Sequence, residues 1–581
     1  MIKLIHADFF LISVNHDNQR HQRSIKKSVS IFYEVIMHTH NAYFSKPIIY
    51  TLLFLSLAFQ GCNDKPVRES SQPRQCERPE LTRQIHIPPV PRPSNQHALV
   101  VGINQYQNVS NLKGAVNDAK LLTQALRRAK VQLPDERILL DTQATREAFL
   151  KAWHDMLNQA QPGDTLILTF SGHGIQQETD TPPLDELDQK DEGLIFHEFD
   201  FKRAIGYIID DELYGLFEKA SEYQIVFLVD ACHSSGMKRS TAQVSEQSVR
   251  FAGSFPIIPT LPSSLPTTHQ EENLPHVTLI TAVERDTLKV IETSFNGKLH
   301  GALSWYFAEA LDGKANGNQN HYLERQELDA YLRENVRRHT AQRQIPKLLP
   351  AADRQSVIKL PSRIAPTSAH PNIPEIAVYI NDEKTIVDKG LKQVRFVSSA
   401  QSADLRFIIK AQETEVFNRT GDKVTSLSSS ALKQWQRVID KERLLNVLAT
   451  QFDMRRKPIW ICLEEGDGLH QAGTKLHFNI EPGNANLNAL TLFNLAGDGQ
   501  LQFLYPQHNH PQRVQKFPYR LEMEVAAPYG SDHLVAVLCE KPAIALQRLL
   551  DENWPNAPEK ILSQLRDKSC QVGQYAFFSS E

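Results

Sequence analysis

A regular alternation of apolar runs and amphipathic stretches between residues 97 and 338 is the feature that most constrains the fold. Five apolar runs have the composition of buried strands, at 97–104, 137–140, 164–170, 223–230 and 276–282. Five further stretches repeat apolar residues at helical spacing, at 114–130, 144–160, 210–220, 301–311 and 324–338. Because strands separated by helices form parallel βαβ units, we expect an α/β domain with a doubly wound, mostly parallel sheet and helices on both faces.

The composition narrows the class of protein. Of 581 residues, 41% are hydrophobic and 23% are charged, which excludes a wholly disordered chain, a collagen-like fibre and a polytopic membrane protein. A net charge of −3 gives no indication of nucleic-acid binding. The six cysteines form no C-x-x-C pair, so we expect neither a disulfide scaffold nor a structural zinc site. We interpret Cys462, Cys539 and Cys570 as core or idle thiols.

The first 62 residues have the pattern of an export segment. The fourteen residues Pro47–Gln60 are apolar but shorter than the ~20 that span a bilayer. With Lys46 before them, they fit the apolar region of a signal peptide, with translation starting at Met37. Gly61 and Cys62 come next and resemble the lipobox of bacterial lipoproteins. This resemblance makes Cys62 the expected lipidation site. A buried apolar strand is the alternative.

The remaining chain divides at changes in composition. Residues 63–96 contain seven prolines between Pro66 and Pro93, which is typical of an extended tether. A signal, a tether and then folded domains predict an exported lipoprotein of the bacterial cell envelope, on the periplasmic side, that touches the membrane through its lipid anchor alone. The expected domains are an α/β domain at 97–361, a β-rich accessory domain at 375–550 and a tail at 551–581.

Two motifs that contain candidate catalytic residues directly follow apolar runs predicted to be buried strands. SGHG contains His173 and DACHSSG contains Cys232, and each comes at the C-terminal end of its strand. Ligands of open α/β sheets bind at that edge, so the two side chains are expected close together. An imidazole lowers the pKa of a nearby thiol and later protonates the leaving amine. Glycines on both sides of His173 let the backbone approach a substrate closely. Backbone N–H groups around Cys232 are suited to form an oxyanion hole.

Other interpretations of these motifs remain open. A cysteine after an apolar strand is often an inert buried residue, and a histidine between glycines can be a turn residue. His233 is a rival general base, although neighbours in sequence usually point in different directions.

Together with the upstream VGIN and GAVNDA, these motifs resemble the caspase-like cysteine peptidases, particularly the metacaspases and bacterial orthocaspases. The resemblance covers His97 to Leu360 and includes the acidic stretch 185–200, IIDDEL and QRQIPKLL. It implies a caspase-like fold, an endopeptidase acting on proteins or peptides, His173 as general base and Cys232 as nucleophile.

The resemblance also implies a specificity pocket. Asp118, Asp230 and Ser171 match metacaspase pocket residues, and buried carboxylates suit a basic side chain because an unpaired buried cation is costly. We therefore expect cleavage after Arg or Lys. The alternative for Asp118 is a solvated helix face.

Calcium is the one cofactor that the resemblance suggests. Asp191, Asp210 and Asp211 match metacaspase calcium ligands, and Ca²⁺ requires oxygen ligands of this kind. A fourth family ligand is missing, since residues 237–239 are MKR. An acidic solvated loop is the alternative.

The segment between the strands at 223–230 and 276–282 is rich in Ser, Thr, Gln and Pro. Loops of this length in a compact domain are usually functional or exposed. It carries Lys238, Arg239 and Arg250, so we expect self-cleavage there. An uncut surface insertion is the alternative.

The C-terminal half changes to short strands with turns. We expect a hairpin at 489–506 and a second strand pair at 521–542, joined through Pro528–Gly530. The region resembles a β-sandwich domain of unknown function often attached to bacterial caspase-like peptidases. It contains no catalytic constellation, and the sequence does not identify its partner.

Two other functions compete with an exported cysteine endopeptidase. The first is a catalytically silent caspase homologue that acts as an envelope scaffold or binding protein through its β-rich domain. The second is a different Cys-His hydrolase, such as a glutaminase-like amidohydrolase, which the acidic segments disfavour.

Overall fold

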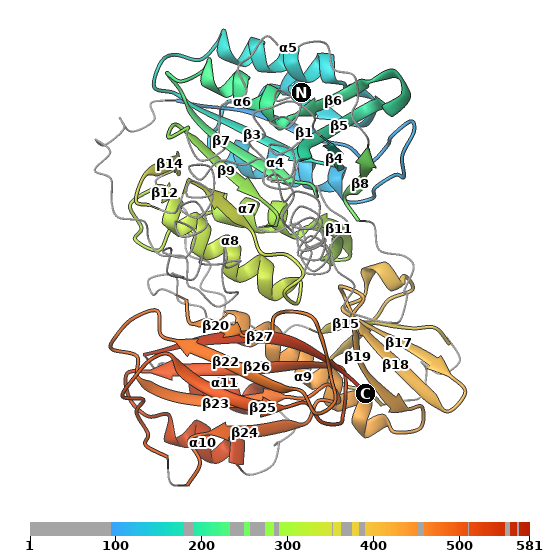
Figure 1. The fold of residues 1–581 in the computed structure, drawn as a ribbon, viewed down its shortest axis with the longest axis vertical. Coiled ribbons are helices and arrows are strands. Elements are labelled where there is room, and N and C mark those ends of the chain that lie inside the picture. Colours follow the sequence, from blue (N-terminus) through green and yellow to red (C-terminus); the bar gives the residue numbers. More distant parts are fainter. Residues whose placement is uncertain are drawn as a thin grey trace, which may run out of the picture. The chain divides into compact units, whose positions relative to one another are not determined.

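We analysed a computed structural model of the chain (Figure 1). It describes the following residues: 95–178, 190–232, 249–255, 274–283, 290–350, 353–361, 375–382, 390–450, 458–508, 510–551, 558–565 and 569–581. The predicted export segment at 1–62, Cys62 and most of the tether lie outside this part of the chain. Among the described residues, no helix has the length and apolar character needed to cross a membrane.

A six-stranded sheet forms the centre of the α/β domain. Its order is β13-β9-β7-β3-β1-β2, and the ladders joining β9, β7, β3, β1 and β2 are all parallel. The antiparallel strand β13 forms one edge. The strands are β1 (Gln96–Gly102), β2 (Ile138–Leu140), β3 (Thr165–Ser171), β7 (Gln224–Asp230), β9 (Val277–Thr281) and β13 (Lys347–Leu349). The predicted mostly parallel sheet is confirmed.

Helices cover both faces of this sheet, as predicted (Figure 1). They are α4 (Ala115–Arg128), α5 (Arg146–Leu157), α6 (Asp210–Glu218), α7 (Ala302–Leu311) and α8 (Arg325–His339). Leu122 of α4 and Phe307 of α7 share one apolar core, and Trp153 of α5 and Phe217 of α6 share the other. At Gly102 a Cβ atom would lie 2.5 Å from the Cβ of Ala119, so the glycine allows α4 to approach the end of β1.

The domain also contains a separate four-stranded sheet, in the order β6-β5-β4-β8. Its strands are β4 (Gly174–Glu178), β5 (Lys190–Asp200), β6 (Ile205–Ile209) and β8 (Phe251–Phe255). Part of the acidic stretch 185–200 is therefore a strand. Two short pairs complete the domain, with strands β10 (Glu292–Phe295), β11 (Lys298–Gly301), β12 (Tyr322–Glu324) and β14 (Ser356–Lys359). Short 3₁₀ helices occur at Asp135–Arg137, Asp141–Gln143, Phe201–Arg203 and, further along the chain, Ala400–Ser402.

The C-terminal region begins with a five-stranded mixed sheet. Its strands, in spatial order, are β16 (Val394–Phe396), β15 (Ile376–Ile380), β17 (Leu405–Lys410), β18 (Glu413–Asn418) and β19 (Lys423–Ser428). The helix α9 (Leu432–Thr450) follows and packs Trp435 and Ile439 into the core of this sheet.

Two further sheets pack face to face through one apolar core, which agrees with the β-sandwich-like expectation. Phe478 and Ile480 of one sheet meet Leu492 and Phe577 of the other. The smaller sheet contains β20 (Trp460–Leu463), β22 (Lys475–Glu481) and β25 (Tyr519–Glu524). The larger contains β21 (Leu469–Gln471), β27 (Cys570–Ser580), β26 (Ser531–Cys539), β23 (Ala489–Leu495) and β24 (Leu501–Tyr505).

The structure confirms one expectation about this region and corrects two. The hairpin at 489–506 is present as β23 and β24, but the pair expected at 521–542 is not a hairpin, because β25 and β26 belong to different sheets. Residues 551–581 are not a tail: β27 pairs with β26 and β21, because its apolar run is buried on both faces. The helices α10 (Ile544–Asp551) and α11 (Pro558–Leu565) precede it.

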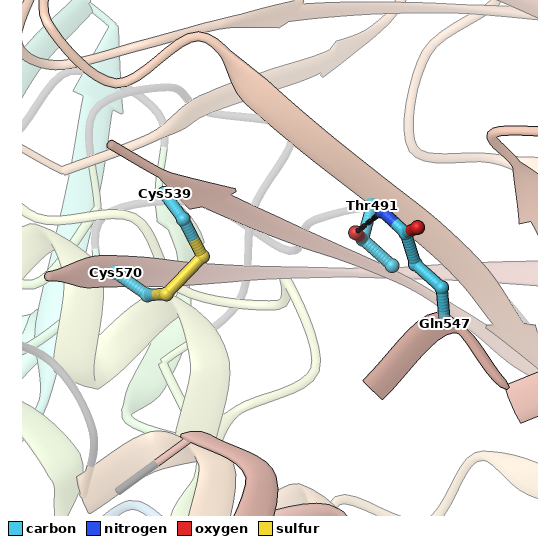
Figure 2. Close-up of a disulfide and its surroundings, with 4 residues drawn as sticks. All are labelled: Thr491, Cys539, Gln547 and Cys570. Atoms are coloured by element: carbon cyan, nitrogen blue, oxygen red, sulfur yellow. Dashed lines mark hydrogen bonds between the residues drawn. A yellow bond between two sulfur atoms is a disulfide. The ribbon is translucent and has the colours of Figure 1, made fainter. Parts of the chain in front are cut away.

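The cysteines of this region are disulfide-bonded and not idle thiols. Cys539 and Cys570 lie opposite each other on β26 and β27 and form a disulfide (Figure 2). Near this bond, the Gln547 side chain of α10 donates to Thr491 Oγ1 of β23 at 3.1 Å. Cys462 is disulfide-bonded as well. Thiols that face each other across a strand pair are placed for oxidation, which spacing along the sequence does not reveal.

Candidate active site

His173 and Cys232 occupy equivalent positions beyond two neighbouring strands. In the parallel ladder between β3 and β7, Ser171 pairs with Asp230. Each of the two candidate residues comes two positions after its strand's paired residue, so both emerge at the same edge of the sheet. Both side chains are buried. The structure therefore brings together the two residues that the motifs single out.

The surroundings of His173 fix the direction of its ring. Nε2 lies 2.8 Å from the backbone oxygen of Ser110, and because a carbonyl can only accept, Nε2 carries the proton. Nδ1 is then the basic nitrogen, and it has no hydrogen-bond partner among the described residues. The backbone N–H of His173 donates to Tyr106 Oη at 2.8 Å. Burial lowers the pKa of His173 to about 4, with a further contribution from the charge of Arg250, so the ring is neutral at physiological pH.

Two backbone N–H groups converge on one oxygen beside Cys232. The amides of Cys232 and Gly174 both donate to the backbone oxygen of Arg250, at 3.0 and 3.1 Å. A pair of amides that meet at one carbonyl oxygen is the arrangement of an oxyanion hole. The carbonyl of Arg250 therefore lies where a substrate carbonyl would be polarised next to the thiol.

The backbone on both sides of Arg250 is extended and paired. Its N–H donates to the oxygen of Val290 at 3.0 Å, and Val249 forms an antiparallel bridge with Ile291. After it, β8 pairs with β4 in a parallel register that begins at Phe251. Residues 249–255 thus cross the site as an extended segment held on both sides of Arg250, which is how β-strand addition positions a bound peptide.

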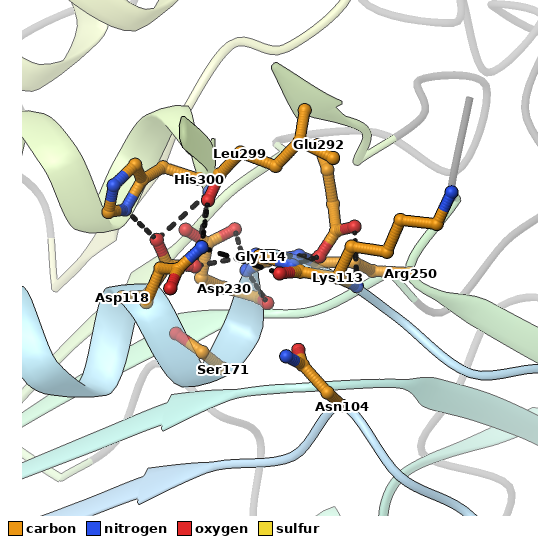
Figure 3. Close-up of polar contacts among 12 residues, drawn as sticks. Asn104, Lys113, Gly114, Asp118, Ser171, Asp230, Arg250, Glu292, Leu299 and His300 are labelled. Carbon is orange, nitrogen blue, oxygen red and sulfur yellow. Dashed lines mark hydrogen bonds and ion pairs between the residues drawn. The ribbon is translucent and has the colours of Figure 1, made fainter. Parts of the chain in front are cut away.

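The side chain of Arg250 fills an acidic pocket (Figure 3). Nη2 lies 2.5 Å from Asp118 Oδ2 and 3.5 Å from Glu292 Oε1. Nη1 lies 3.1 Å from Asp230 Oδ1 and donates to the backbone oxygen of Asp230 at 2.9 Å. All four side chains are buried. Burial opposes the charge of Arg250, but the three carboxylates outweigh it and raise the pKa of the guanidinium.

The pocket aspartates are held by donors from the segment around α7. Asp118 accepts from the Gly301 amide at 3.1 Å and lies 2.9 Å from His300 Nδ1. Asp230 accepts from the amide and hydroxyl of Ser304, at 2.9 and 2.7 Å. At Gly301 a Cβ atom would lie 2.1 Å from Asp230 Oδ2 and 2.6 Å from Arg250 Nη1, so only glycine leaves room for the guanidinium.

The predicted pocket residues therefore differ in whether they contact the guanidinium directly. Asp118 and Asp230 contact the bound guanidinium directly. Ser171 instead lies 3.1 Å from the hydroxyl of Ser304, and so reaches Asp230 through that side chain. Sequence reasoning did not assign a role to Glu292 or His300. Both lie inside segments that resemble the second half of the family domain, but a single charged residue in a short strand carries no spacing signal.

The predicted calcium ligands come from two segments that the β5–β6 register places side by side. In the antiparallel pair β5–β6, Gly193 faces Ile209. Continuing this pairing brings Asp191 beside Asp210 and Asp211, which form the first turn of α6. Carboxylates are the oxygen ligands that Ca²⁺ requires. Among the described residues, one compact group has metal-ligand spacing, the surface cluster of Glu464, Glu465 and His477.

Other predicted residues lie outside the described part of the chain. These are Lys238 and Arg239 of the expected self-cleavage segment, and the rival base His233. Of the three basic residues named for self-cleavage, the structure describes Arg250.

The central sheet and the paired motifs define a caspase-like domain, and comparison with known proteins agrees. Residues 95–355 match the family model described as "Caspase domain". This confirms the predicted resemblance over that part of the chain.

Relatives among characterised proteins are metacaspases. Metacaspase-1A of Aspergillus niger is 35% identical over 146 residues, which is 24% of this chain and 35% of the relative. Metacaspase-1 of Eremothecium gossypii is 36% identical over 149 residues, covering 24% and 32% of the two chains. The match thus spans about a third of the length of these curated relatives.

Solved structures with similarity include a protein from Geobacter sulfurreducens, with a TM-score of 0.32 and 19% identity over 46% of this chain and 98% of that chain. Caspase-1 from Spodoptera frugiperda has a TM-score of 0.30 and 11% identity over 48% and 97% of the two chains. The fold assignment rests on the family match and on the sheet order described above.

Proposed function

We propose that this chain is a cysteine endopeptidase in which Cys232 is the nucleophile and His173 is the general base. One observation carries the proposal: a segment of the chain lies across the site as a substrate would, with the carbonyl of Arg250 accepting from the amides of Cys232 and Gly174. The buried acidic pocket around the Arg250 side chain supports cleavage after basic residues, Arg or Lys. Proteins or peptides with such sites are the substrates.

The chemistry follows from the groups at the site. Nδ1 of His173 accepts the thiol proton, and the sulfur of Cys232 bonds to the carbonyl carbon of the residue in the pocket. The two amides stabilise the oxyanion that forms. His173 then protonates the leaving amine as the C–N bond breaks, and water hydrolyses the thioester, which releases the carboxylate and restores the thiol.

Replacement of the nucleophile tests this proposal. Wild-type protein should hydrolyse fluorogenic peptides that end in Arg or Lys, and Cys232→Ala should lower kcat/KM by at least ~10³-fold, since covalent catalysis is lost. A thiol alkylator should label Cys232 and inactivate the enzyme. Full activity in Cys232→Ala would overturn the assignment, and turnover of peptides ending in Asp alone would overturn the specificity. Wild-type protein that turns over no peptide would favour the alternative, a silent homologue that acts as an envelope scaffold.

We also propose that the Arg250–Phe251 bond is cut by the same site in the same chain. The backbone and side chain of Arg250 are already held at the thiol, so the reaction needs no second molecule. Wild-type protein should yield a new N-terminus at Phe251 at a rate independent of protein concentration. Cys232→Ala and Arg250→Ala should stay intact at this bond, with Arg239→Ala as the matched control that is still cut. A cut before Phe251 in Cys232→Ala would identify an outside protease.

We propose that Asp191, Asp210 and Asp211 bind calcium, supported by the β5–β6 register, in which their backbone positions follow directly beyond the Gly193–Ile209 pair. The ion would place positive charge at the end of β4, the strand that directly follows His173. Calorimetric titration of Cys232→Ala with Ca²⁺ should show binding that Asp210→Asn and Asp211→Asn weaken. Equal heats in all three proteins would overturn the proposal.

Export to the bacterial envelope, with a lipid anchor at Cys62, is the proposed location. The Cys539–Cys570 disulfide supports it, because disulfides persist mainly in oxidising compartments outside the cytosol. Palmitate labelling of the cells should mark the wild-type chain and not Cys62→Ala. Recovery of unlabelled wild-type protein from the cytosol would contradict the proposal. The C-terminal sheets are proposed as a docking module whose partner is unknown.

A further inference from the structure

Tyr106 contacts the candidate catalytic histidine in two ways. It lies in the loop of residues 103–114 that joins β1 to α4, and its side chain is buried. Its hydroxyl oxygen accepts from the backbone N–H of His173 at 2.8 Å. Its ring lies against the imidazole, with the two ring centroids 4.9 Å apart and the planes inclined by 53°. Tyr106 therefore holds His173 both by an atom of its main chain and by the face of its ring.

The Tyr106 hydroxyl fits beside the histidine because residue 172 is a glycine. A Cβ atom at Gly172 would lie 2.6 Å from Tyr106 Oη and 3.0 Å from the ring of Phe170. A side chain at this position would displace the hydroxyl from the N–H of His173. Of the two glycines beside the histidine, the first thus makes room for Tyr106.

The loop that carries Tyr106 is held by hydrogen bonds, so the hydroxyl has a defined position. The Tyr106 N–H donates to Asn111 Oδ1 at 2.9 Å. Asp141 Oδ1 accepts from the amides of Asn104 and Gln105, at 2.8 and 3.0 Å. These bonds close the loop on itself and tie its start to the segment after β2.

The same loop reaches two other groups of the site. The backbone oxygen of Ser110 accepts from Nε2 of His173 at 2.8 Å. The amides of Lys113 and Gly114 donate to the carboxylate of Glu292, at 2.9 and 2.7 Å. The Ser110 contact at the far end of the ring fixes the direction of the imidazole. A contact at the backbone instead fixes where the ring begins and where the next N–H group points.

The backbone position of His173 matters because the next residue supplies a donor to the oxyanion. The Gly174 amide donates to the backbone oxygen of Arg250 at 3.1 Å. Oxyanion donors act only when they lie about 2.7–3.1 Å from the oxygen that becomes charged. A shift of the peptide before His173 would therefore move both the base and this donor.

We propose that Tyr106 is a positioning residue that holds the imidazole of His173 and the amide of Gly174 in place for catalysis. This inference rests on the proposed function, because it requires His173 as the base and Gly174 as an oxyanion donor. The hydroxyl acts through the main chain, and its loss leaves a buried N–H group without a partner. The ring covers one face of the imidazole and excludes water from it.

The effects of the ring and of the hydroxyl can be separated by pH. Burial lowers the pKa of His173 to about 4, and the charge of Arg250 contributes to the lowering. Burial raises the pKa of Tyr106, so its hydroxyl stays neutral. Because His173 must be neutral to accept a proton, activity is lost as the pH falls through its pKa. Water at the imidazole would raise this pKa toward its usual value and move that acid limb to higher pH. Arg250 and Cys232, the other titratable side chains at this edge, stay unchanged in the variants below.

The test measures hydrolysis of a fluorogenic Gln-Ser-Val-Arg amide, which follows residues 247–250, by processed enzyme. Titration of active sites with a thiol alkylator makes kcat refer to intact sites alone. Tyr106→Phe should lower kcat by ~10-fold and leave KM within ~2-fold, because the acidic pocket is untouched. This variant keeps the ring and should therefore keep the wild-type acid limb of kcat/KM.

A second variant removes the ring as well. Tyr106→Leu should lower kcat/KM at pH 7 by ~10²-fold, because both the main-chain contact and the cover of the imidazole are lost. Its acid limb should move up by at least ~1 pH unit, since water then reaches His173.

Tyr331→Phe is the matched control for loss of a buried tyrosine hydroxyl. Tyr331 of α8 is buried, and its hydroxyl donates to Glu309 Oε2 of α7 at 2.9 Å. Tyr331→Phe should keep the wild-type kcat, KM and acid limb, because this bond joins two helices and does not involve His173.

The outcomes separate this inference from the proposed function. A kcat per titrated site in Tyr106→Phe within ~2-fold of wild type would overturn the role of the hydroxyl and leave the peptidase intact. An acid limb in folded Tyr106→Leu that coincides with the wild-type limb would do the same for the ring. If Tyr106→Leu does not fold, the result for Tyr106→Phe decides alone. Wild-type enzyme that hydrolyses no Arg peptide would instead remove the proposed function, and this inference with it.

Discussion

Two buried cations, Arg250 in the pocket and Lys441 in the C-terminal region, are stabilised in opposite ways. Arg250 faces three carboxylates, and they raise its pKa although burial opposes the charge. Lys441 of α9 donates to the backbone oxygens of Ala496 and Ser531, at 3.1 and 2.5 Å. Burial lowers the pKa of Lys441 to about 8, because neighbouring acids such as Asp532 only partly offset the loss of water.

The difference distinguishes a structural charge from a binding site. The carbonyls around Lys441 belong to the ends of sheet strands and accept from two of the three N–H donors of the ammonium, so this contact ties α9 to β23 and β26. The pocket places three carboxylates around one guanidinium, and removing the cation would leave them buried without a counter-ion, at a cost of several kcal/mol. A pocket of that kind retains a cation strongly but accepts another of the same shape.

The largest expected effect lies in the pocket. Asp230→Asn removes a carboxylate that contacts the guanidinium, and losing one partner of a buried charge pair costs about 3–5 kcal/mol. We expect kcat/KM for Arg peptides to fall by ~10²–10³-fold. Asp532→Asn, which changes a buried aspartate near Lys441, should leave kcat/KM within ~2-fold of wild type, as a remote site requires. Wild-type activity in Asp230→Asn would mean that the pocket does not bind the substrate.

The second prediction concerns Lys441 and alkaline pH. Its folded pKa of about 8 lies below the usual 10.5, so between these values the unfolded chain binds more protons than the folded chain. Stability therefore rises with pH across this window, by up to about 3 kcal/mol from this residue. In a Cys232→Ala background, Lys441→Met should lose that rise. Parallel pH profiles of unfolding free energy in the two proteins would show that Lys441 is solvated.

The smallest effect is expected from Arg250→Lys. The ammonium keeps the positive charge but falls short of the carboxylates that face Nη1 and Nη2, so self-cleavage before Phe251 should slow by ~10-fold and not stop. Densitometry of the two fragments against time measures the rate. Complete loss of cleavage, as in Arg250→Ala, would show that the pocket requires a guanidinium absolutely.

Most of the peptidase domain can be predicted from the sequence because its signals are local. The strands that precede His173 and Cys232 are apolar runs, and a parallel sheet places the ends of neighbouring runs at one edge. The pairing of β8 with β4 has no such signal, because this short extended segment pairs through its backbone and not through a side-chain pattern. Glu292 escapes prediction for the same reason, since its partners are backbone amides distant in sequence.

In the C-terminal region, local patterns gave strands but not their partners. The sequence on both sides of Pro528–Gly530 predicts two strands, yet whether they pair depends on which sheet offers each an open edge. The strand β27 has no regular side-chain pattern, because both of its faces are buried and Gln571 and Gln574 interrupt its apolar residues. The disulfide between Cys539 and Cys570 depends on this same long-range pairing.

The ladder between β8 and β4 has a kinetic consequence. If the proposed cut before Phe251 takes place, the contacts of the intact chain would keep the residues on its C-terminal side paired and Arg250 in its pocket. A tethered segment of this kind competes with free peptides at an effective concentration of roughly millimolar. Scission and onset of activity are therefore separate events, and the enzyme should show a lag set by departure of the cut ends. On the proposed self-cleavage, a delay would therefore separate processing from action on other substrates.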